Sequence, residues 1–394
     1  MTLPQDKLHT AVADVMNKVI AWRRHLHAHP ELSFLEYNTA QFVYDALRPL
    51  PGLEVSRPTR TSVLAKLVGK KPGKTIALRA DMDALPIQEE HDFDFVSQAP
   101  GVMHACGHDG HTAILLGVAM VLSELTDDLT GEVRLIFQHA EELYPGGAEE
   151  LVRAGVMEGV DVVLGAHLWA PLPVGLVAVT PGPLLAAPDT FHITIRGSGG
   201  HAAEPQKTVD PIAVGAQVVV NLQHICSRYK DPFLPGVVSV TQFVAGTADN
   251  VIPETSLLAG TVRTFDRELR EQIPEQMKRI VQGVCAAHGA TMEWEYQLGY
   301  RAVVNNEAVT DRLRAILLRE FGESGVTVAK PTMGGEDFSA YLAKVPGSFF
   351  LIGAGNTAAG IVHPHHHPRF TVDEAALAIG VRAYVRAVVE WWQA

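Results

Sequence analysis

The sequence predicts an α/β fold, in which a mainly parallel sheet with helices on both faces is interrupted by a smaller inserted α+β domain. Two observations carry this prediction. Over the first 185 residues short, very apolar segments alternate with helical ones, and over residues 187–298 the elements follow a different order. Apolar runs between helices are typical of strands buried on both faces of a parallel sheet. We therefore expect an α/β domain over residues 1–186 and 299–394, and an inserted domain over 187–298.

The elements expected in the α/β domain follow from the apolar pattern and from residues that end helices. The first helix spans residues 5–29 and ends before Pro30, because proline disfavours the helical conformation in the residue that precedes it. The other expected elements are strands at 61–69, 75–80, 132–140 and 161–169, a helix over about 111–125, and, after Tyr300, a helix at 311–322, a strand at 348–355 and a helix at 373–392.

The inserted domain has the element order β-α-β-β-α-β. Its expected strands lie at 189–197, 236–246, 256–266 and 291–298, and its expected helices at 209–228 and 268–289. Pro274 falls in the first turns of the second helix. This order is the split β-α-β pattern of a ferredoxin-like sandwich.

The composition excludes several classes of protein. The chain has 394 residues, 47% of them hydrophobic, and its net charge of −12 without a long Lys/Arg run argues against nucleic-acid binding. It has no run of 18 apolar residues that would predict a membrane span, and its start lacks the basic and apolar regions of a secretory signal. Three cysteines do not make a disulfide framework, so we expect a cytoplasmic protein. The 18 histidines, several beside carboxylates, favour an enzyme.

The segment MHACGHDGHTA, residues 103–113, combines a thiol with imidazoles. Cys106 and His108 are two residues apart in a glycine-containing loop, where a thiolate and an imidazole can hold one divalent metal ion or bridge two. A polar loop with a free thiol is the alternative. A zinc ribbon is excluded, because the chain has no second cysteine pair.

Three further apolar strands end in acidic or metal-competent residues. Glu141 and Glu142 end one strand and His167 another, at the edge where α/β sheets bind ligands. Asp81 and Asp83 end a third strand and are candidates to accept the second N–H of a metal-binding imidazole. Each has a structural alternative when taken singly: an acidic helix N-terminus, a core histidine or a capped turn. Their convergence on one edge predicts a bimetallic hydrolytic site that activates water.

A set of longer motifs runs through nearly the whole chain. The segments are RRHLHAHPELSFLEYNTA, RADMDALPIQE, MHACGHDGHTAILLG, FQHAEE, GAHLW, GSGGHAAEPQKTVDPI, ADNVIPE, GTVRTFD, MGGEDFSAYL and HHPRF. In this order they resemble the metal-dependent aminoacylase and carboxypeptidase family. The closer resemblance is to its branch of hippurate hydrolases, auxin-conjugate hydrolases and bacterial N-acyl-amino-acid amidohydrolases.

The resemblance implies a role for each residue of the predicted site. In that branch the cysteine of the C-G-H motif, here Cys106, bridges two divalent metal ions, and the histidine of the motif, His108, binds one of them. Of the two glutamates in H-A-E-E, Glu142 is a metal ligand and Glu141 is the general base and later the acid. The histidine of the G-A-H motif, His167, is a further ligand.

The resemblance also implies a last histidine ligand near the end of the chain. His366 matches its position, with His367 where the family usually has Ser or Asn. Residues 363–368 read HPHHHP, so His363, His365 and His367 compete for the role, and spacing to the following proline and phenylalanine favours His366.

Five more residues take their roles from the resemblance. Asp83 matches an aspartate that orients the metal site, and Asp81 stands where other branches use a metal-binding histidine, a ligand that here has moved to His108. The inserted domain resembles the family's lid and dimerisation domain. In it, His201 matches a histidine donated across the dimer to stabilise the oxyanion. Asn250 and Arg263 match residues that hold the substrate's free carboxylate.

The function implied is metal-dependent hydrolysis of N-acyl-L-amino acids to a carboxylic acid and a free amino acid. Alternatives are a dipeptidase or carboxypeptidase on the same scaffold, a nonhydrolytic metal- or ligand-binding relative, and a thiol hydrolase that uses Cys106. Retention of Glu141 argues against a binding protein, which needs no general base, and the surrounding carboxylates suit metal better than a thiol triad.

The expected cofactors are two divalent metal ions per chain. Mixed sulfur, nitrogen and oxygen ligands allow zinc, cobalt, manganese or nickel. The expected partner is a small-molecule substrate, with no nucleic acid and no membrane. A homodimer or higher homo-oligomer through the inserted domain is implied by the resemblance and favoured by a free edge strand.

Overall fold

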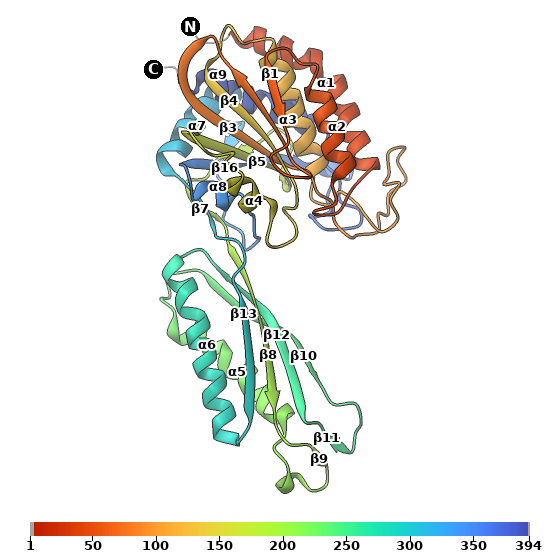
Figure 1. Cartoon of the computed structure of the whole chain (residues 1–394), viewed down its shortest axis with the longest axis vertical. Coiled ribbons are helices and arrows are strands. Elements are labelled where there is room, and N and C mark those ends of the chain that lie inside the picture. Colours follow the sequence, from red (N-terminus) through yellow and green to blue (C-terminus); the bar gives the residue numbers. More distant parts are fainter. Residues whose placement is uncertain (1–3, 393–394) are drawn as a thin grey trace. The chain divides into compact units, whose positions relative to one another are not determined.

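The computed structural model describes residues 4–392, which form two compact units (Figure 1). The core unit comprises the described residues up to 184, residues 304–330 and those from 337 onward. The inserted unit comprises residues 185–303 and 331–336. Compared with the expected insertion, the inserted unit also includes 185–186, 299–303 and 331–336.

The core unit contains the long helices and the larger sheet. Its helices are α1 (Gln5–Ala28), α2 (Tyr37–Leu47), α3 (His108–Ser123), α4 (Gly147–Arg153), α7 (Glu307–Phe321), α8 (Ser339–Leu342) and α9 (Ala375–Trp391), with a 3-10 turn at Thr357–Ala359. Its sheet strands are β1 (Leu53–Ser56), β2 (Val63–Val68), β3 (Lys71–Asp81), β4 (Thr130–Gln138), β5 (Val162–Pro173), β6 (Val177–Ala178), β15 (Val326–Thr327) and β16 (Gly347–Gly355). The chain passes between the units in the short strands β7 (Gly182–Leu185) and β14 (Val303–Asn305).

The eight strands form one mixed sheet in the order β1-β2-β4-β3-β5-β16-β6-β15. The central strands β4, β3, β5 and β16 are parallel, and antiparallel pairs flank them. All nine residues of β16 are buried, as are the first seven of β5, which explains why their sequences are continuously apolar. The expected large, mainly parallel sheet is therefore confirmed. Because β3 and β4 end side by side, the residues that follow them reach one edge of the sheet.

Helix α3 begins earlier than the sequence predicts. The expected start was about residue 111, whereas the helix begins at His108. Gly107 precedes it with a φ of 92°, a left-handed conformation that glycine adopts without a Cβ penalty and that lets the chain turn into the helix. Consequently His108 and His111 lie on the first turn of a buried helix, whereas Cys106 lies in the preceding loop.

A buried carboxylate joins three helices of the core unit. The Glu320 side chain in α7 has no exposed surface and accepts hydrogen bonds from Arg382 (2.7 Å) and Arg386 (2.9 Å) of α9, while His9 of α1 lies 2.8 Å away. Burial disfavours the ionised form, but the hydrogen bonds from His9 and Arg382 outweigh it, so the pKa of Glu320 lies below its ordinary value of 4.5.

Glu320→Gln is expected to lower the free energy of unfolding at neutral pH by about 3 kcal/mol, because the guanidinium of Arg382 loses its carboxylate partner and the buried guanidinium of Arg386 keeps only Glu390. The pKa is lower in the folded state, so this stabilisation is complete above about pH 4.5 and is lost as the pH falls through the folded-state value. Urea unfolding of both proteins over this range measures it, with Asp128→Asn, which removes an exposed ion pair with Lys7, as control. A difference that stays constant into acid would contradict the assignment.

The inserted unit is a ferredoxin-like sandwich, as predicted. Its elements are β8 (Ala187–Arg196), β9 (Gly200–His201), a 3-10 turn at Pro205–Lys207, α5 (Pro211–His224), a π-helical turn at Ile225–Tyr229, β10 (Gly236–Ala245), β11 (Val251–Ile252), β12 (Thr255–Thr264), α6 (Arg267–His288) and β13 (Thr291–Gln297). The antiparallel sheet has the order β10-β12-β8-β13, and α5 and α6 contribute to a shared apolar core with its strands. Pro274 is tolerated inside α6, and β9 pairs separately with β11.

Among residues 4–392, no helix is long and apolar enough to cross a membrane.

Candidate active site

Polar residues from five segments of the core unit converge at the carboxyl ends of its parallel strands. They come from the loop before α3 and its first turn, the segments after β3 and β4, strand β5, and the loop before α9. Most of them are buried, so their polar atoms have little access to bulk water.

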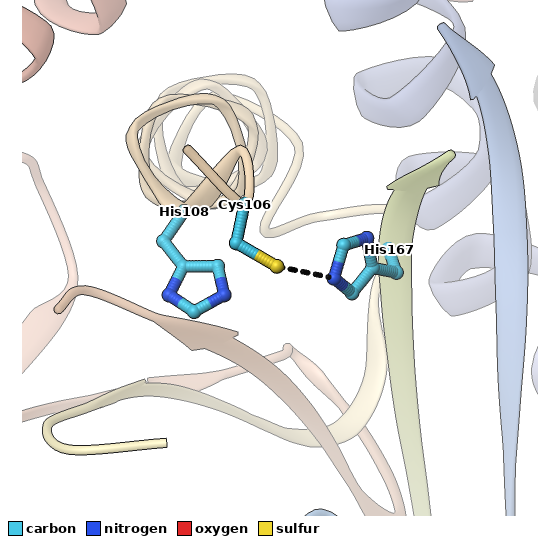
Figure 2. A group of neighbouring side chains, drawn as sticks. All are labelled: Cys106, His108 and His167. Atoms are coloured by element: carbon cyan, nitrogen blue, oxygen red, sulfur yellow. Dashed lines mark hydrogen bonds between the residues drawn. The ribbon is translucent and has the colours of Figure 1, made fainter. Parts of the chain in front are cut away.

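The first group of side chains consists of Cys106, His108 and His167 (Figure 2). Cys106 Sγ lies 3.4 Å from His167 Nε2, and one candidate ligand atom from each residue lies within 4.8 Å of the others. His167 Nδ1 donates to the Leu168 carbonyl (2.8 Å) and His108 Nδ1 to the Asp83 carbonyl (2.9 Å). Both imidazoles therefore direct Nε2 into the group. Burial, followed by the nearby His111, holds the pKa of His167 well below its ordinary value, so its Nε2 lone pair is available.

The second group consists of Cys106, Glu142 and His366, which also have ligand atoms within 4.8 Å of one another. His366 Nε2 lies 3.2 Å from Glu142 Oε1. His366 has a φ of 64°, and its backbone N–H donates to the Ala105 carbonyl (2.8 Å), which brings its side chain beside the residue next to Ala105. Cys106 belongs to both groups.

The structure separates His366 from the three histidines beside it. His365 Nε2 donates to the Leu168 carbonyl (3.0 Å), and burial lowers the pKa of His365 to about 4. The rings of His363 and His367 stack on each other with centroids 4.2 Å apart. Of the four, His366 is the one that forms a close group with Cys106 and Glu142.

Glu141 and Asp83 lie beside these groups. Glu141 is 7% exposed and has a carboxylate oxygen within 4.8 Å of ligand atoms of His108 and Glu142. Asp83 Oδ2 accepts hydrogen bonds from the Glu142 backbone N–H (2.9 Å) and from Ser33 Oγ (2.7 Å). Burial raises the pKa of Asp83, but the hydrogen bond and charge of His108 outweigh this effect and leave it below the ordinary value. Asp83 is thus an anion that orients both His108 and the backbone of Glu142.

Asp81 and His111 form a third close group with His108, but their polar atoms are already committed. His111 Nδ1 donates to Asp81 Oδ1 (2.6 Å), and its Nε2 accepts the Leu168 backbone N–H (2.8 Å). The other Asp81 oxygen accepts from Arg79. Asp81 and His111 are therefore held by hydrogen bonds to residues around the site, and their side-chain atoms are not free to bind a metal ion.

The two groups fit divalent metal ions. Within the described part of the chain, His108 Nε2 and Glu142 Oε1 are buried without a hydrogen-bond partner. Burial lowers the pKa of His108, but the charges of Asp81, Asp83 and Glu142 outweigh it and raise this pKa to about 10. Burial, and then the charges of Glu142, Glu141 and Asp81, raise the pKa of the Cys106 thiol. The cluster thus favours positive charge, and its sulfur, nitrogen and oxygen donors suit borderline divalent metals.

The three residues that the sequence predicts in the inserted unit lie at two separate positions. His201 and Asn250 are in or beside the β9–β11 pair, and Arg263 is in β12. His201 lies opposite Val251 in the β9–β11 pair, so Asn250 is its neighbour, and the Asn250 carbonyl accepts the Ala202 N–H (3.1 Å). His201 Nδ1 accepts the Ala203 backbone N–H (3.0 Å), which leaves the ring proton on Nε2.

Arg263 lies at the other end of the sheet in the inserted unit. It is paired with Pro188 near the start of β8, whereas β9 follows the end of that ten-residue strand, a separation of roughly 25–30 Å. Its guanidinium donates to the Thr261 hydroxyl and to the Val262 carbonyl (3.1 Å). Among residues 4–392 it forms no ion pair with a carboxylate. The structure therefore does not bring Arg263 of one chain together with His201 and Asn250 of the same chain.

Sequence reasoning missed the buried residues beneath the cluster. Arg79 donates to Gln138 Oε1 (2.8 Å) and to Asp337 Oδ1 (2.9 Å), and Asp337 also accepts from Gln138 and from the Ala148 N–H (3.0 Å). Burial, only partly offset by Arg79, raises the pKa of Asp337 to about 6. The available signal was a charged residue, Arg79, directly after the apolar run Ile76–Leu78 of β3.

The chain is similar over most of its length to several known proteins. The chain is 56% identical over 349 residues to an N-acyl-L-amino acid amidohydrolase of Geobacillus stearothermophilus, covering 89% of this chain and 94% of that protein. It is 43% identical to thermostable carboxypeptidase 1 of Saccharolobus solfataricus, covering 98% of each. The crystal structure of the YXEP protein of Bacillus subtilis, a dinuclear metal-binding peptidase of the M20 family, matches with a TM-score of 0.83 and 38% identity over 96% of this chain and 98% of that one. Residues 77–390 match the model of peptidase family M20/M25/M40, and the chain belongs to this family.

Proposed function

We propose that this metal-dependent amidohydrolase cleaves the amide bond of N-acyl-L-amino acids, releasing a carboxylic acid and a free amino acid. The observation that carries the proposal is a buried glutamate, Glu141, beside two ligand groups that share Cys106. The 56% identity to an N-acyl-L-amino acid amidohydrolase supports this substrate class.

Each ligand group is suited to one of two divalent ions. Cys106, His108 and His167 would hold one ion and Cys106, Glu142 and His366 the other, with Cys106 common to both groups. Ions held by these residues would supply Lewis-acid chemistry, lowering the pKa of a water molecule and polarising the amide carbonyl. Zinc, cobalt, manganese and nickel all suit this donor set.

The chain's own residues then move the protons. Glu141 takes a proton from the attacking water and delivers it to the nitrogen of the leaving amine, a role that its position beside Glu142 and His108 supports. Asp83, which accepts the Glu142 backbone N–H, keeps the segment that carries Glu141 in place and directs His108 Nε2 into the site. Because the Cys106 thiol is buried in an acidic cluster that raises its pKa, it is poorly suited to act as a nucleophile.

We assign substrate binding and oxyanion stabilisation to the inserted unit. His201 carries its proton on Nε2 and can donate it to a developing oxyanion. Arg263, which has no carboxylate partner of its own in the described chain, suits the free α-carboxylate of the substrate, together with Asn250. The unit would act as a lid and as the dimerisation domain.

The separation of these residues favours a homodimer, and the three free cysteines favour a cytoplasmic location. A single chain cannot present Asn250 and Arg263 to one small carboxylate when the length of β8 lies between them. Two chains can, if His201 and Asn250 come from the partner. β10 is an edge strand of its sheet, with Phe243 and Val244 exposed at 40% and 61%, and it offers a surface on which the two inserted units can pair.

A carboxypeptidase or dipeptidase is the second candidate function. The observation that favours it is the 43% identity to a thermostable carboxypeptidase over nearly the whole chain. A nonhydrolytic relative would need neither Glu141 nor a complete ligand set.

Amine release from a panel of substrates separates these functions. The enzyme, stripped of metal under reducing conditions and reloaded with zinc, manganese or cobalt, is expected to release amine from N-acyl amino acids. The matching N-acyl amino acid amides, which lack the free carboxylate, should react at least about tenfold more slowly, because a hydrogen-bonded charge pair is lost. Release from dipeptides alone would assign a dipeptidase. Two bound ions without release from any substrate would contradict both hydrolytic functions.

A further inference from the structure

A buried glutamate outside the ligand groups holds the backbone that carries Glu141. Glu36, the residue before α2, has no exposed surface. Its Oε1 accepts the backbone N–H of Phe34 (3.0 Å) and the backbone N–H of Ala140 (2.8 Å). Ala140 is 104 residues further along the chain and directly precedes Glu141. One carboxylate oxygen therefore connects the loop before α2 to the segment after β4.

Both donors have a backbone conformation that their residue types disfavour. Phe34 has a φ of 66° and Ala140 a φ of 49°, and they are two of the three non-glycine residues with positive φ among residues 4–392. Each such residue costs of order 1–3 kcal/mol and persists only where its surroundings hold it. Glu36 supplies a hydrogen bond to both, so it stabilises the conformation that turns the chain from β4 into Glu141.

The hydrogen bond to Ala140 is one of two that flank Glu141. On the other side the Glu142 N–H donates to Asp83 Oδ2 (2.9 Å), and Ser33 Oγ donates to the same oxygen (2.7 Å). The backbone N–H groups of the residues before and after Glu141 are thus each held by a buried carboxylate. One of these carboxylates belongs to segment 33–36, and the other accepts a hydrogen bond from it. We propose that Glu36 is a positioning residue for the catalytic glutamate Glu141, acting through the backbone of Ala140. This inference rests on the proposed role of Glu141.

Glu36 contributes an acceptor oxygen to these N–H groups and forms no ion pair in the described chain. Its Oε2 is buried and has no hydrogen-bond partner in the described chain, and no cation forms an ion pair with it there. Burial, and then the negative charge of Asp83, raises the pKa of Glu36 to about 7. A neutral side chain with the same acceptor can therefore replace it.

The test compares variants of Glu36 with the wild type in the metal-loaded enzyme. Glu36→Met, which has no acceptor, is expected to lower kcat about 10- to 100-fold with KM changed less than threefold, because a catalytic group displaced by an ångström loses this much. Glu36→Gln should stay within threefold of wild-type kcat. Both should bind two metal ions. Should Glu36→Met fail to fold, Glu36→Asp, which is too short to reach both N–H groups, is expected to show the same loss.

Glu31→Met is the matched control. Glu31 lies in the same segment and accepts four hydrogen bonds from Asn38 and Thr39 at the start of α2, but none from residues 140–142. Its loss should lower the melting temperature as much as the loss of Glu36 and leave kcat unchanged. Equal loss of kcat in both variants, or wild-type kcat in folded Glu36→Met, would overturn the proposal.

Hydrogen–deuterium exchange provides a readout that does not depend on activity. A peptide covering residues 139–143 should exchange faster in Glu36→Met than in wild type or Glu36→Gln. Failure of the wild type to hydrolyse N-acyl amino acids would reject the substrate assignment alone, whereas unchanged exchange in this peptide would reject the role of Glu36 alone.

Discussion

Replacing Glu141 by glutamine is expected to lower kcat by about 10²–10⁴-fold while both metal ions stay bound. Glutamine has nearly the same shape but cannot take a proton from water at neutral pH. Glu141 is not a member of either group that contains Cys106, so the ligand atoms of those groups remain in the variant. The loss should therefore fall on turnover and not on metal content.

Steady-state kinetics and metal analysis on the same preparation measure both quantities. Glu150→Gln is a suitable control, because Glu150 is a nearby, half-exposed carboxylate that contacts His139 (3.0 Å) and belongs to none of the close groups. It should keep wild-type kcat. If Glu141→Gln kept a tenth of the wild-type kcat, another residue would be the proton carrier.

Removal of Cys106 is expected to abolish binding of both ions, since it is the residue that the two ligand groups share. In Cys106→Ala, kcat should fall by at least about 10³-fold, because the water-activating ions are absent. His366→Ala, which removes a ligand from one group, should lose one ion and retain the other. Metal content per chain, with the thiolate–cobalt absorption of the cobalt-loaded enzyme, distinguishes these outcomes.

Cys226→Ala is the control for loss of a thiol. Cys226 is a free, half-buried cysteine of the inserted unit, and its loss should change neither metal content nor absorption. Two tightly bound ions in Cys106→Ala would show that the thiolate is not the bridging ligand. In that case the two groups would act as independent sites, with His108 and His167 forming one and Glu142 and His366 the other.

The strands that carry the site could be predicted because buried strands have long apolar runs in their sequences. β3, β4 and β5 lie in the middle of the sheet, so most residues in their buried parts are apolar, and polar residues within or just after these strands, such as Asp81 and His167, stand out. β6 and β15, of two residues each, have no such pattern and form only because neighbouring strands pair with them.

Features that depend on distant contacts could not be predicted. Spacing favours His366 among the four histidines near that position, but the contact of its backbone with Ala105 and the hydrogen bond of His365 to Leu168 join segments far apart in the chain. The early start of α3 depends on the φ of Gly107, and the role proposed for Glu36 depends on Ala140, more than 100 residues away. Local sequence shows which residue types are present, but it does not show which backbone groups will lie beside them.

The residues of the two proposed ligand groups lie partly before and partly after the inserted unit in the sequence, so they are synthesised at different times. Cys106, His108 and His167 leave the ribosome before the inserted unit, while His366 follows His167 by about 200 residues. At 5–20 residues per second the second group is incomplete for about 10–40 s after the first has been synthesised. Strand β16, which pairs with the strand that carries His167, is synthesised just before His366. A chain that terminates between His167 and His366 would contain the residues of the first proposed ligand group but lack His366, so the second proposed group requires the segment that follows the insertion.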